Sequence, residues 1–319
     1  MWVWLRVSAK AFDNSEGSQT ACFQWVFRCP SIFKSHEEAG EKALIVTFHS
    51  YKGGTGKTLL SVNLAIVFAK MGKRVCILDL DLRAPSLHSI FRNRSNYWVN
   101  DYLNKACIIE KVLAECNIKE VPNGKLLVGL ANPSTEAIRE MESKDRNWEI
   151  EALGRLFSLK ATLLNDMHLD YVFFDASPGL NYSSINAIVC ADVVLVVTST
   201  DKSDVEGTRR MIHDLYELFD KKTGIIVNKI PSEYLSSKNH DSNSRIIETH
   251  QLPIVGMLPC SCEVLSAEGR CLFACEKPDH PFTEKLREIS VNLERFGSAK
   301  EKRKRAVLGL ATEISSSVD

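Results

Sequence analysis

One short segment, KGGTGKT at residues 52–58, combines residue types that bind phosphate groups. Its glycines let the backbone turn amide N–H groups inward without Cβ clashes. A nest of amides at the start of a helix attracts anions, so we expect a phosphate there. Within this loop, Lys57 should reach the β- and γ-phosphates of a nucleotide, and the Thr58 hydroxyl should ligate Mg²⁺. The predicted phosphate site comprises Lys52, Gly53, Gly54, Thr55, Gly56, Lys57, Thr58 and Leu59.

The sequence on either side supplies the two elements that such a loop needs. Ala43 to Phe48 is a short apolar run with β-branched residues, which is typical of a buried parallel strand. After the loop, apolar residues recur at helical spacing, and Gly72 stands where a helix cap favours positive φ. The other interpretation of segment 52–58 is a glycine-rich turn with two incidental lysines. It does not account for the order of strand, loop and helix.

Acidic residues follow two further apolar runs. Asp79 and Asp81 stand at the end of a predicted strand from Arg74 to Leu80, where open α/β sheets place their ligand sites. An aspartate there can hold a metal-bound water or orient an attacking water. The alternative is that both only cap the next turn. Tyr171 to Phe174 is a second such run, and it delivers Asp175 to the position of a Mg²⁺-shell carboxylate.

These segments together resemble the ParA/MinD family of P-loop ATPases. The family's loop reads KGGxGKT, and its extra lysine is Lys52 here. The segment DLDLRAPSLH resembles the second family motif, with the switch I aspartate at Asp81. Residues 175–179 resemble switch II, in which a glycine amide can sense the γ-phosphate. Two positions depart from the pattern: Tyr51 replaces the glycine of the general phosphate loop, and Leu59 replaces the usual threonine or serine.

The resemblance covers residues 42–295 and implies ATP and Mg²⁺ as cofactors. It implies a metal shell of Thr58, Asp81 and Asp175, with Lys52 and Asp81 as catalytic residues. In the family the extra lysine crosses a two-fold interface to the partner's nucleotide, so an ATP-dependent homodimer is expected. Such proteins use ATP hydrolysis to partition chromosomes or plasmids, or to place the division site. A protein activator or cargo adaptor is therefore an expected partner.

The base of the nucleotide is expected near the end of the sheet. The predicted strand Gly224 to Asn228 ends at the position where the family has an asparagine that reads the adenine edge. A turn residue after a strand is an equal interpretation of Asn228. Pro259 begins a segment, 259–266, that resembles the loop closing over the base.

Other functions remain open on the same fold. DLDLRAPSLH also resembles bacterial tyrosine kinases, although their tail is rich in tyrosine and here none follows Tyr234. A metal-cluster carrier or biosynthetic enzyme is another alternative, and a scaffold that does not hydrolyse nucleotide is a third. The carrier rests on a CxC-x8-CxxxC pattern whose spacing is unusual for zinc, so we expect ordinary thiols. Its cysteines are Cys260, Cys262, Cys271 and Cys275.

The whole chain has 319 residues with 40 basic and 40 acidic side chains, so it has no net charge to attract nucleic acid or membrane. No apolar run reaches the roughly 18 residues that span a bilayer. The first residues are too short and too poorly patterned for a secretory signal. We therefore expect a cytoplasmic location, with a peripheral position at the inner face of the membrane as an option. A basic segment, residues 300–305, could contact lipid or DNA, but a solvated tail is preferred.

Strand-like and helix-like segments alternate along the chain, which predicts an α/β fold with a doubly wound, mainly parallel sheet and helices on both faces. The expected organisation is an N-terminal extension over 1–41, an ATPase domain over 42–295 and a C-terminal tail over 296–319. Further strands are expected at 125–130, 192–198 and 253–258, and helices at 96–116, 148–164 and 200–219.

Overall fold

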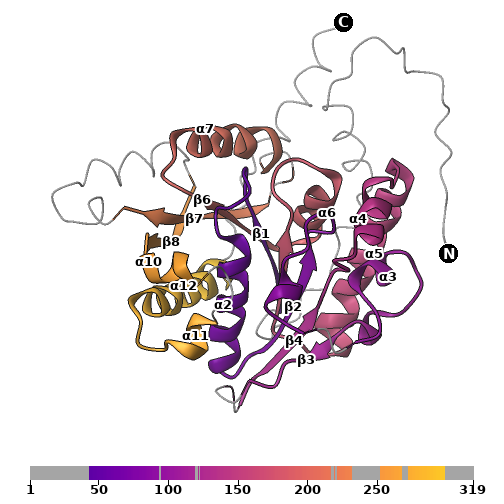
Figure 1. Ribbon diagram of the computed structural model, residues 1–319, viewed down its shortest axis with the longest axis horizontal. Helices are drawn as coiled ribbons and strands as arrows, with labels where there is room; N and C mark the ends of the chain where they lie inside the picture. Colours follow the sequence, from indigo (N-terminus) through magenta and orange to yellow (C-terminus); the bar gives the residue numbers. More distant parts are fainter. Residues whose placement is uncertain are drawn as a thin grey trace, which may run out of the picture. The chain divides into compact units, whose positions relative to one another are not determined.

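The computed structural model describes residues 43–92, 95–118, 121, 123–216, 219, 221–231, 252–267 and 272–298. Eight strands form one sheet in the order β3-β4-β2-β5-β1-β6-β7-β8 (Figure 1). The strands are β1 (Leu44–His49), β2 (Arg74–Leu80), β3 (Ala114–Glu115), β4 (Lys125–Gly129), β5 (Tyr171–Ala176), β6 (Val193–Thr198), β7 (Lys222–Ile230) and β8 (Ile254–Pro259). The β3–β4 pair is antiparallel, and the other described pairs are parallel. The predicted fold class is confirmed.

Helices cover both faces of the sheet. Successive side chains of a strand point to opposite faces, so the central strand β1 contacts helices on each side. On one face, Val46 and Phe48 of β1 belong to a core that includes α2 and α12, which pack side by side (Figure 1). On the other face, the Thr47 hydroxyl donates to the carbonyl oxygen of Ala187 in α6 at 3.0 Å. The helices are α2 (Lys57–Lys70), α3 (Val99–Leu103), α4 (Thr135–Glu142), α5 (Arg146–Ala161), α6 (Tyr182–Cys190), α7 (Lys202–Met211), α10 (Cys262–Ser266), α11 (Phe273–Glu276) and α12 (Pro281–Ser298).

Short turns of other helix types extend these elements. Two are 3-10 turns, η3 (Leu87–Ser89) and η4 (Ile109–Lys111). Two are π-helical turns, η5 (Thr162–Asp166) after α5 and η6 (Ile212–Tyr216) after α7. The predicted helices over 148–164 and 200–219 are thus each an α-helix that widens in its last turn. Side-chain caps start both helices, because Asp145 and Asp201 accept hydrogen bonds from the backbone N–H three residues on.

The predicted helix over 96–116 is wrong. The segment contains only the short helix α3, the turn η4 and the edge strand β3. Lys105 has a φ of 64°, a left-handed conformation that ends α3. Tertiary contacts then decide the rest, since the backbone N–H of Cys116 pairs with the carbonyl of Leu126 beside the sheet. Helices α6, α10, α11 and α12 are not among those that the sequence patterns predict.

The proposed domain limits stay predictions. Residues 1–41 and the tail beyond Ser298 lie outside the described residues, and α12 continues past residue 295 to Ser298. Within the described part, none of the helices is both long enough and apolar enough to cross a membrane.

Candidate nucleotide-binding site

The loop between β1 and α2 has the geometry of a phosphate cradle. Gly54 and Gly56 have φ values of 75° and 99°, and Gly56 is the N-cap of α2. A Cβ atom on Gly56 would lie 2.4 Å from Asn228 Nδ2, so only glycine fits there. A Cβ on Gly53 or Gly54 would meet no atom within 4 Å, which leaves open space beside this bend. The N-terminus of α2 follows directly, and its dipole favours an anion in that space.

Lys57 is the cation on the inner side of the loop. It is 7% exposed, and its Nζ donates to Ser50 Oγ at 2.9 Å. Burial lowers the pKa of Lys57, while the charges of Asp175, Asp81 and Asp204 act in the opposite direction. Lys57 thus lies among opposite charges and, when protonated, can neutralise an incoming phosphate.

Asp175 provides the strongest sign of a cation site. It is 1% exposed at the end of β5, and in the described part of the chain neither carboxylate oxygen has a hydrogen bond of good geometry, although the hydroxyls of Thr58 and Ser61 lie close enough to lower its pKa. Burial raises the pKa of Asp175 to about 6, against the lowering effect of the neighbouring Thr58 hydroxyl and Lys57 ammonium. Thr58 shares a hydrogen bond of 3.1 Å with Ser86 Oγ. Carboxylate and hydroxyl oxygens are the ligands that Mg²⁺ prefers, so these residues fit that ion.

Asp79 and Asp81 have different roles from each other. Asp79 is aligned with Asp175 across the β2–β5 pair, and its carboxylate accepts the backbone N–H groups of Asp81, Ser86 and Leu87 at 3.1–3.2 Å. It therefore shapes the loop that follows β2. Asp81 is half-buried, and its Oδ1 accepts the N–H of Ala84 at 3.2 Å, so the turn expected as the alternative is present. Its charge still acts on Lys57, so it faces the site as well.

A hollow of about 350 Å³ continues from the loop toward the last strands of the sheet. It is lined by Gly54, Lys57 and Thr58 at one end and by Asn228 and Pro259 at the other. This volume suits the rest of a nucleotide. The Asn228 side chain donates to the carbonyl oxygen of Thr55 at 2.8 Å, so it braces the phosphate loop while lining the hollow.

Sequence reasoning missed Lys229. Its φ of 58° is unusual for a side chain of this size, and its Nζ donates to the Gly54 carbonyl oxygen at 2.7 Å. Because Lys229 also lines the hollow, it adds a second cation to the base side of the loop. The position of Lys229 directly after Asn228 in the sequence is the feature from which its place at the site could have been predicted.

The outer rim of the loop is held by α7. Lys52 Nζ lies 3.1 Å from Asp201 Oδ1 and also contacts Ser203 Oγ, both at the start of that helix. The ring of Tyr51 covers Gly207, where a Cβ atom would lie 2.0 Å from Tyr51 Cε1. The tyrosine that departs from the loop pattern is therefore matched by a glycine inside a helix.

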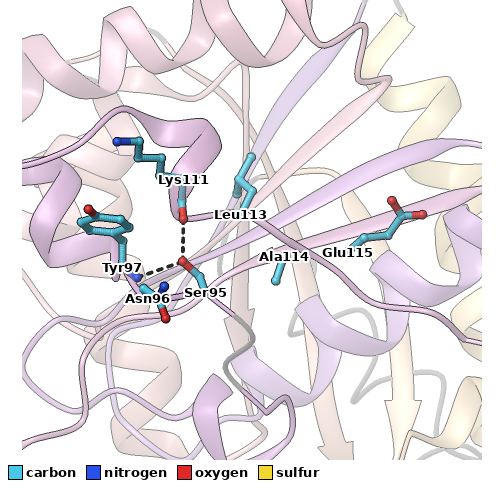
Figure 2. Close-up of a pocket in the computed structure, with 7 residues that line it drawn as sticks. All are labelled: Ser95, Asn96, Tyr97, Lys111, Leu113, Ala114 and Glu115. Carbon is cyan, nitrogen blue, oxygen red and sulfur yellow. Dashed lines mark hydrogen bonds between the residues drawn. The ribbon is translucent and has the colours of Figure 1, made fainter.

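A larger hollow of about 460 Å³ lies beside the edge strand β3, away from the loop (Figure 2). Figure 2 shows Ser95 Oγ contacting the Lys111 carbonyl oxygen and the Tyr97 N–H, and the Lys111 ammonium lies 5.6 Å from the Tyr97 ring centre. The acidic side chain in its lining is Glu115. The buried carboxylates of Asp79 and Asp175 lie beside the phosphate loop and are not in the lining of this hollow.

Comparison with known proteins agrees with this geometry. A model of the AAA domain matches residues 43–231, more than half of the chain. The septum site-determining protein MinD of Synechocystis sp. is 29% identical over 228 residues, which are 71% of this chain and 79% of that protein.

Solved structures show the same fold. A chain of the MinC:MinD cell division protein complex of Aquifex aeolicus matches with a TM-score of 0.63 at 25% identity, over 81% of this chain and 98% of that one. MinD of Pyrococcus horikoshii, complexed with Mg-ADP, matches with a TM-score of 0.65 at 18% identity, over 82% and 100%. The chain belongs to the ParA/MinD family of P-loop ATPases.

Placed in this family, the predicted site residues fall into two groups. The structure brings Lys57, Thr58, Asp81 and Asp175 together around the start of α2, with Asn228 and Pro259 along the adjoining hollow. Lys52 is not part of that cluster, because it points to α7. Its expected role toward a partner's nucleotide stays a prediction.

The cysteine pattern is only partly visible. Cys260 and Cys262 are exposed, Cys275 is half-buried, and Cys271 lies outside the described residues. In the parts of the chain that the structure describes, no three His, Cys, Asp or Glu side chains are grouped to hold a metal ion. Whether these thiols act as ordinary side chains stays a prediction.

Proposed function

We propose that this chain is an ATP-dependent molecular switch that binds ATP with Mg²⁺, hydrolyses it, and forms a homodimer in the ATP-bound state. The observation that carries the proposal is the buried Asp175 carboxylate beside the Thr58 hydroxyl and the buried Lys57 ammonium. Burying a carboxylate costs free energy, and a cation with its water molecules in the site would compensate that cost during the working cycle.

Each residue has a proposed part in hydrolysis. Lys57 leaves Ser50 Oγ to contact the β- and γ-phosphates. Thr58, Asp81 and Asp175 would hold the Mg²⁺ shell, and the ion would neutralise negative charge on the phosphates. Asp81 orients the attacking water. Its position near Lys57 supports this, although its carboxylate also closes the turn to Ala84.

The proposal extends to three contacts outside this cluster. Lys52 leaves Asp201 and reaches the nucleotide of a second copy of the chain. The Gly179 amide senses the γ-phosphate, and Asn228 and Pro259 contact the base. The relatives named septum site-determining protein support a role in placing cellular cargo, with the division site or a chromosome as candidates. A protein activator or adaptor, a cytoplasmic location, and a lipid or DNA contact through residues 300–305 belong to the same proposal.

Sedimentation velocity with saturating ATP·Mg²⁺ or ADP·Mg²⁺ tests this function. The wild type should be monomeric with ADP and associate with ATP. Asp81→Ala should accumulate as an ATP-bound dimer, because it binds nucleotide without positioning the water. Glu142→Ala, which removes an exposed carboxylate at the end of α4, is the matched control and should behave as wild type. An Asp81→Ala chain that stays monomeric in saturating ATP would reject the nucleotide-gated dimer.

A further inference from the structure

The last residue of β1, His49, is fully buried between two partners. Its Nε2 lies 2.8 Å from the Gly179 carbonyl oxygen, and its Nδ1 contacts the Tyr216 hydroxyl. A carbonyl oxygen only accepts, so Nε2 must carry a hydrogen. Burial lowers the pKa of His49 to about 3, the Gly179 hydrogen bond opposes this, and the charge of Lys57 adds to it. The imidazole is therefore neutral, and Nδ1 accepts from Tyr216.

Gly179 is held on both sides of its Cα atom. Its N–H donates to the Ser50 carbonyl oxygen at 2.9 Å, and its carbonyl oxygen accepts from His49 and from Ser184 Oγ at 2.8 Å. Ser50 in turn accepts the Lys57 ammonium. The glycine that ends segment 175–179 thus lies against the residues directly before the phosphate loop.

This arrangement allows the two polar groups of Gly179 to behave differently. The N–H and the carbonyl belong to adjacent peptide units, so one can rotate while the other stays in place. Gly179 has a φ of 78°, and glycine can change its backbone angles without a Cβ clash. A carbonyl fixed by His49 leaves the N–H free to exchange the Ser50 oxygen for a phosphate oxygen.

We propose that His49 is a positioning residue that anchors the Gly179 carbonyl, so that the Gly179 N–H turns to the γ-phosphate and the site distinguishes ATP from ADP. This inference rests on the proposed function, in which Gly179 senses the γ-phosphate. Tyr216 has a supporting part, because its hydroxyl donates to Nδ1 and selects the tautomer with hydrogen on Nε2. Tyr216 ends η6, so the turn after α7 is connected to the same glycine.

Two substitutions of His49 distinguish the loss of its hydrogen bond to the Gly179 carbonyl from the loss of side-chain packing. In His49→Gln, the side-chain amide nitrogen reaches about as far as Nε2 and can still donate to Gly179. In His49→Asn, the amide ends near the position of Nδ1 and cannot reach it. The Asn amide keeps a polar atom near Nδ1 for Tyr216, whereas the Gln amide keeps the donor to Gly179, and Tyr216→Phe measures the loss of the Tyr216 contact alone.

The experiment is calorimetric titration of each variant with ADP·Mg²⁺ and with the β,γ-imido analogue of ATP and Mg²⁺. ADP affinity should stay within about threefold of wild type in both variants, which also shows that they are folded. Affinity for the analogue should fall about tenfold in His49→Asn and be largely restored in His49→Gln, as expected for one lost hydrogen bond to a charged group. Tyr216→Phe should show a smaller loss of the same kind.

Three results would overturn the inference: equal losses for both nucleotides in His49→Asn, no loss for either, or a wild type that binds ADP and the analogue equally well. A wild type that binds neither nucleotide would instead refute the proposed function. The hydrogen bond from His49 can be tested even in that case. ¹⁵N spectra of the imidazole in the nucleotide-free protein should show hydrogen on Nε2 of His49. Hydrogen on Nδ1 alone would reject the anchor whatever the protein binds.

Discussion

The two lysines of the phosphate loop lie in opposite surroundings. Lys57, on the inner side, is buried with the charges of Asp175 and Asp81 acting on it. Lys52, on the rim, keeps 41% of its side-chain surface exposed and pairs with Asp201, which is 61% exposed. Burying a charge costs free energy unless opposite charges compensate it, whereas an exposed ion pair contributes little to stability.

This difference assigns different tasks to the two ends of one loop. The inner lysine donates to the neutral Ser50 hydroxyl, and the charged phosphates of a ligand would be a stronger partner, so it should control affinity. The rim lysine can leave Asp201 at small cost, so it can exchange partners during a cycle. Substitution of Lys57 should therefore change nucleotide affinity, whereas substitution of Lys52 should change the association of two chains.

The largest expected effect comes from Lys57→Ala. Its removal takes away the cation aimed at the phosphates and leaves Asp175 and Asp81 to repel them, so ATP·Mg²⁺ affinity should fall by at least about 100-fold. Isothermal titration measures it. Lys105→Ala, which removes a lysine from an exposed pair with Glu151, is the control and should bind normally. Unchanged affinity in Lys57→Ala would remove this lysine from the site.

Lys52→Ala should leave nucleotide binding nearly intact and impair hydrolysis and association. The variant should bind ATP within about threefold of wild type, but hydrolyse it about 1,000-fold more slowly, in the range known for a cation supplied in trans. It should also dimerise weakly in sedimentation with ATP. Lys202→Ala removes an exposed positive charge from the same rim and should change neither property. Loss of binding in Lys52→Ala would erase the distinction between the two lysines.

Much of the inner region could be predicted because local pattern and function coincide there. The strand and the helix around Lys57 are apolar and buried along nearly their whole length, with the glycine-rich loop between them, and the runs ending at Asp79 and Asp175 form β2 and β5 as expected. Parallel strands bring their carboxyl ends to one edge, so these side chains meet whatever the connections between them. The phosphate site follows from short stretches of sequence.

The rim could not be predicted in the same way, because its contacts join distant residues. Tyr51 departs from the loop pattern, and only the structure pairs it with Gly207. His49 has the pattern of an ordinary strand residue, and its partners are 130 and 167 positions away. The prediction of a helix over 96–116 fails for a related reason, since pairing with β4 overrides the local preference there.

The smallest effect, and the sharpest test of the rim, concerns the Tyr51–Gly207 contact. An interior Gly→Ala change in a helix normally stabilises a protein by about 1 kcal/mol. At Gly207 the new methyl group would overlap the Tyr51 ring, which is 38% exposed and can move outward. We therefore expect the lost packing to cancel the helical gain, so that Gly207→Ala leaves stability unchanged or slightly lower.

A double-mutant cycle with Tyr51→Ala isolates this contact. In the Tyr51→Ala background, Gly207→Ala should raise the free energy of unfolding by about 1 kcal/mol, because the ring is gone and only the helical gain remains. Gly154→Ala in α5 is the matched control: its Cβ would meet no atom within 4 Å, so it should stabilise either background equally. Urea unfolding measures all variants, and ATP affinity should stay within about threefold throughout, since Lys57 is untouched. Additive effects at Tyr51 and Gly207 would show that the ring does not rest on α7.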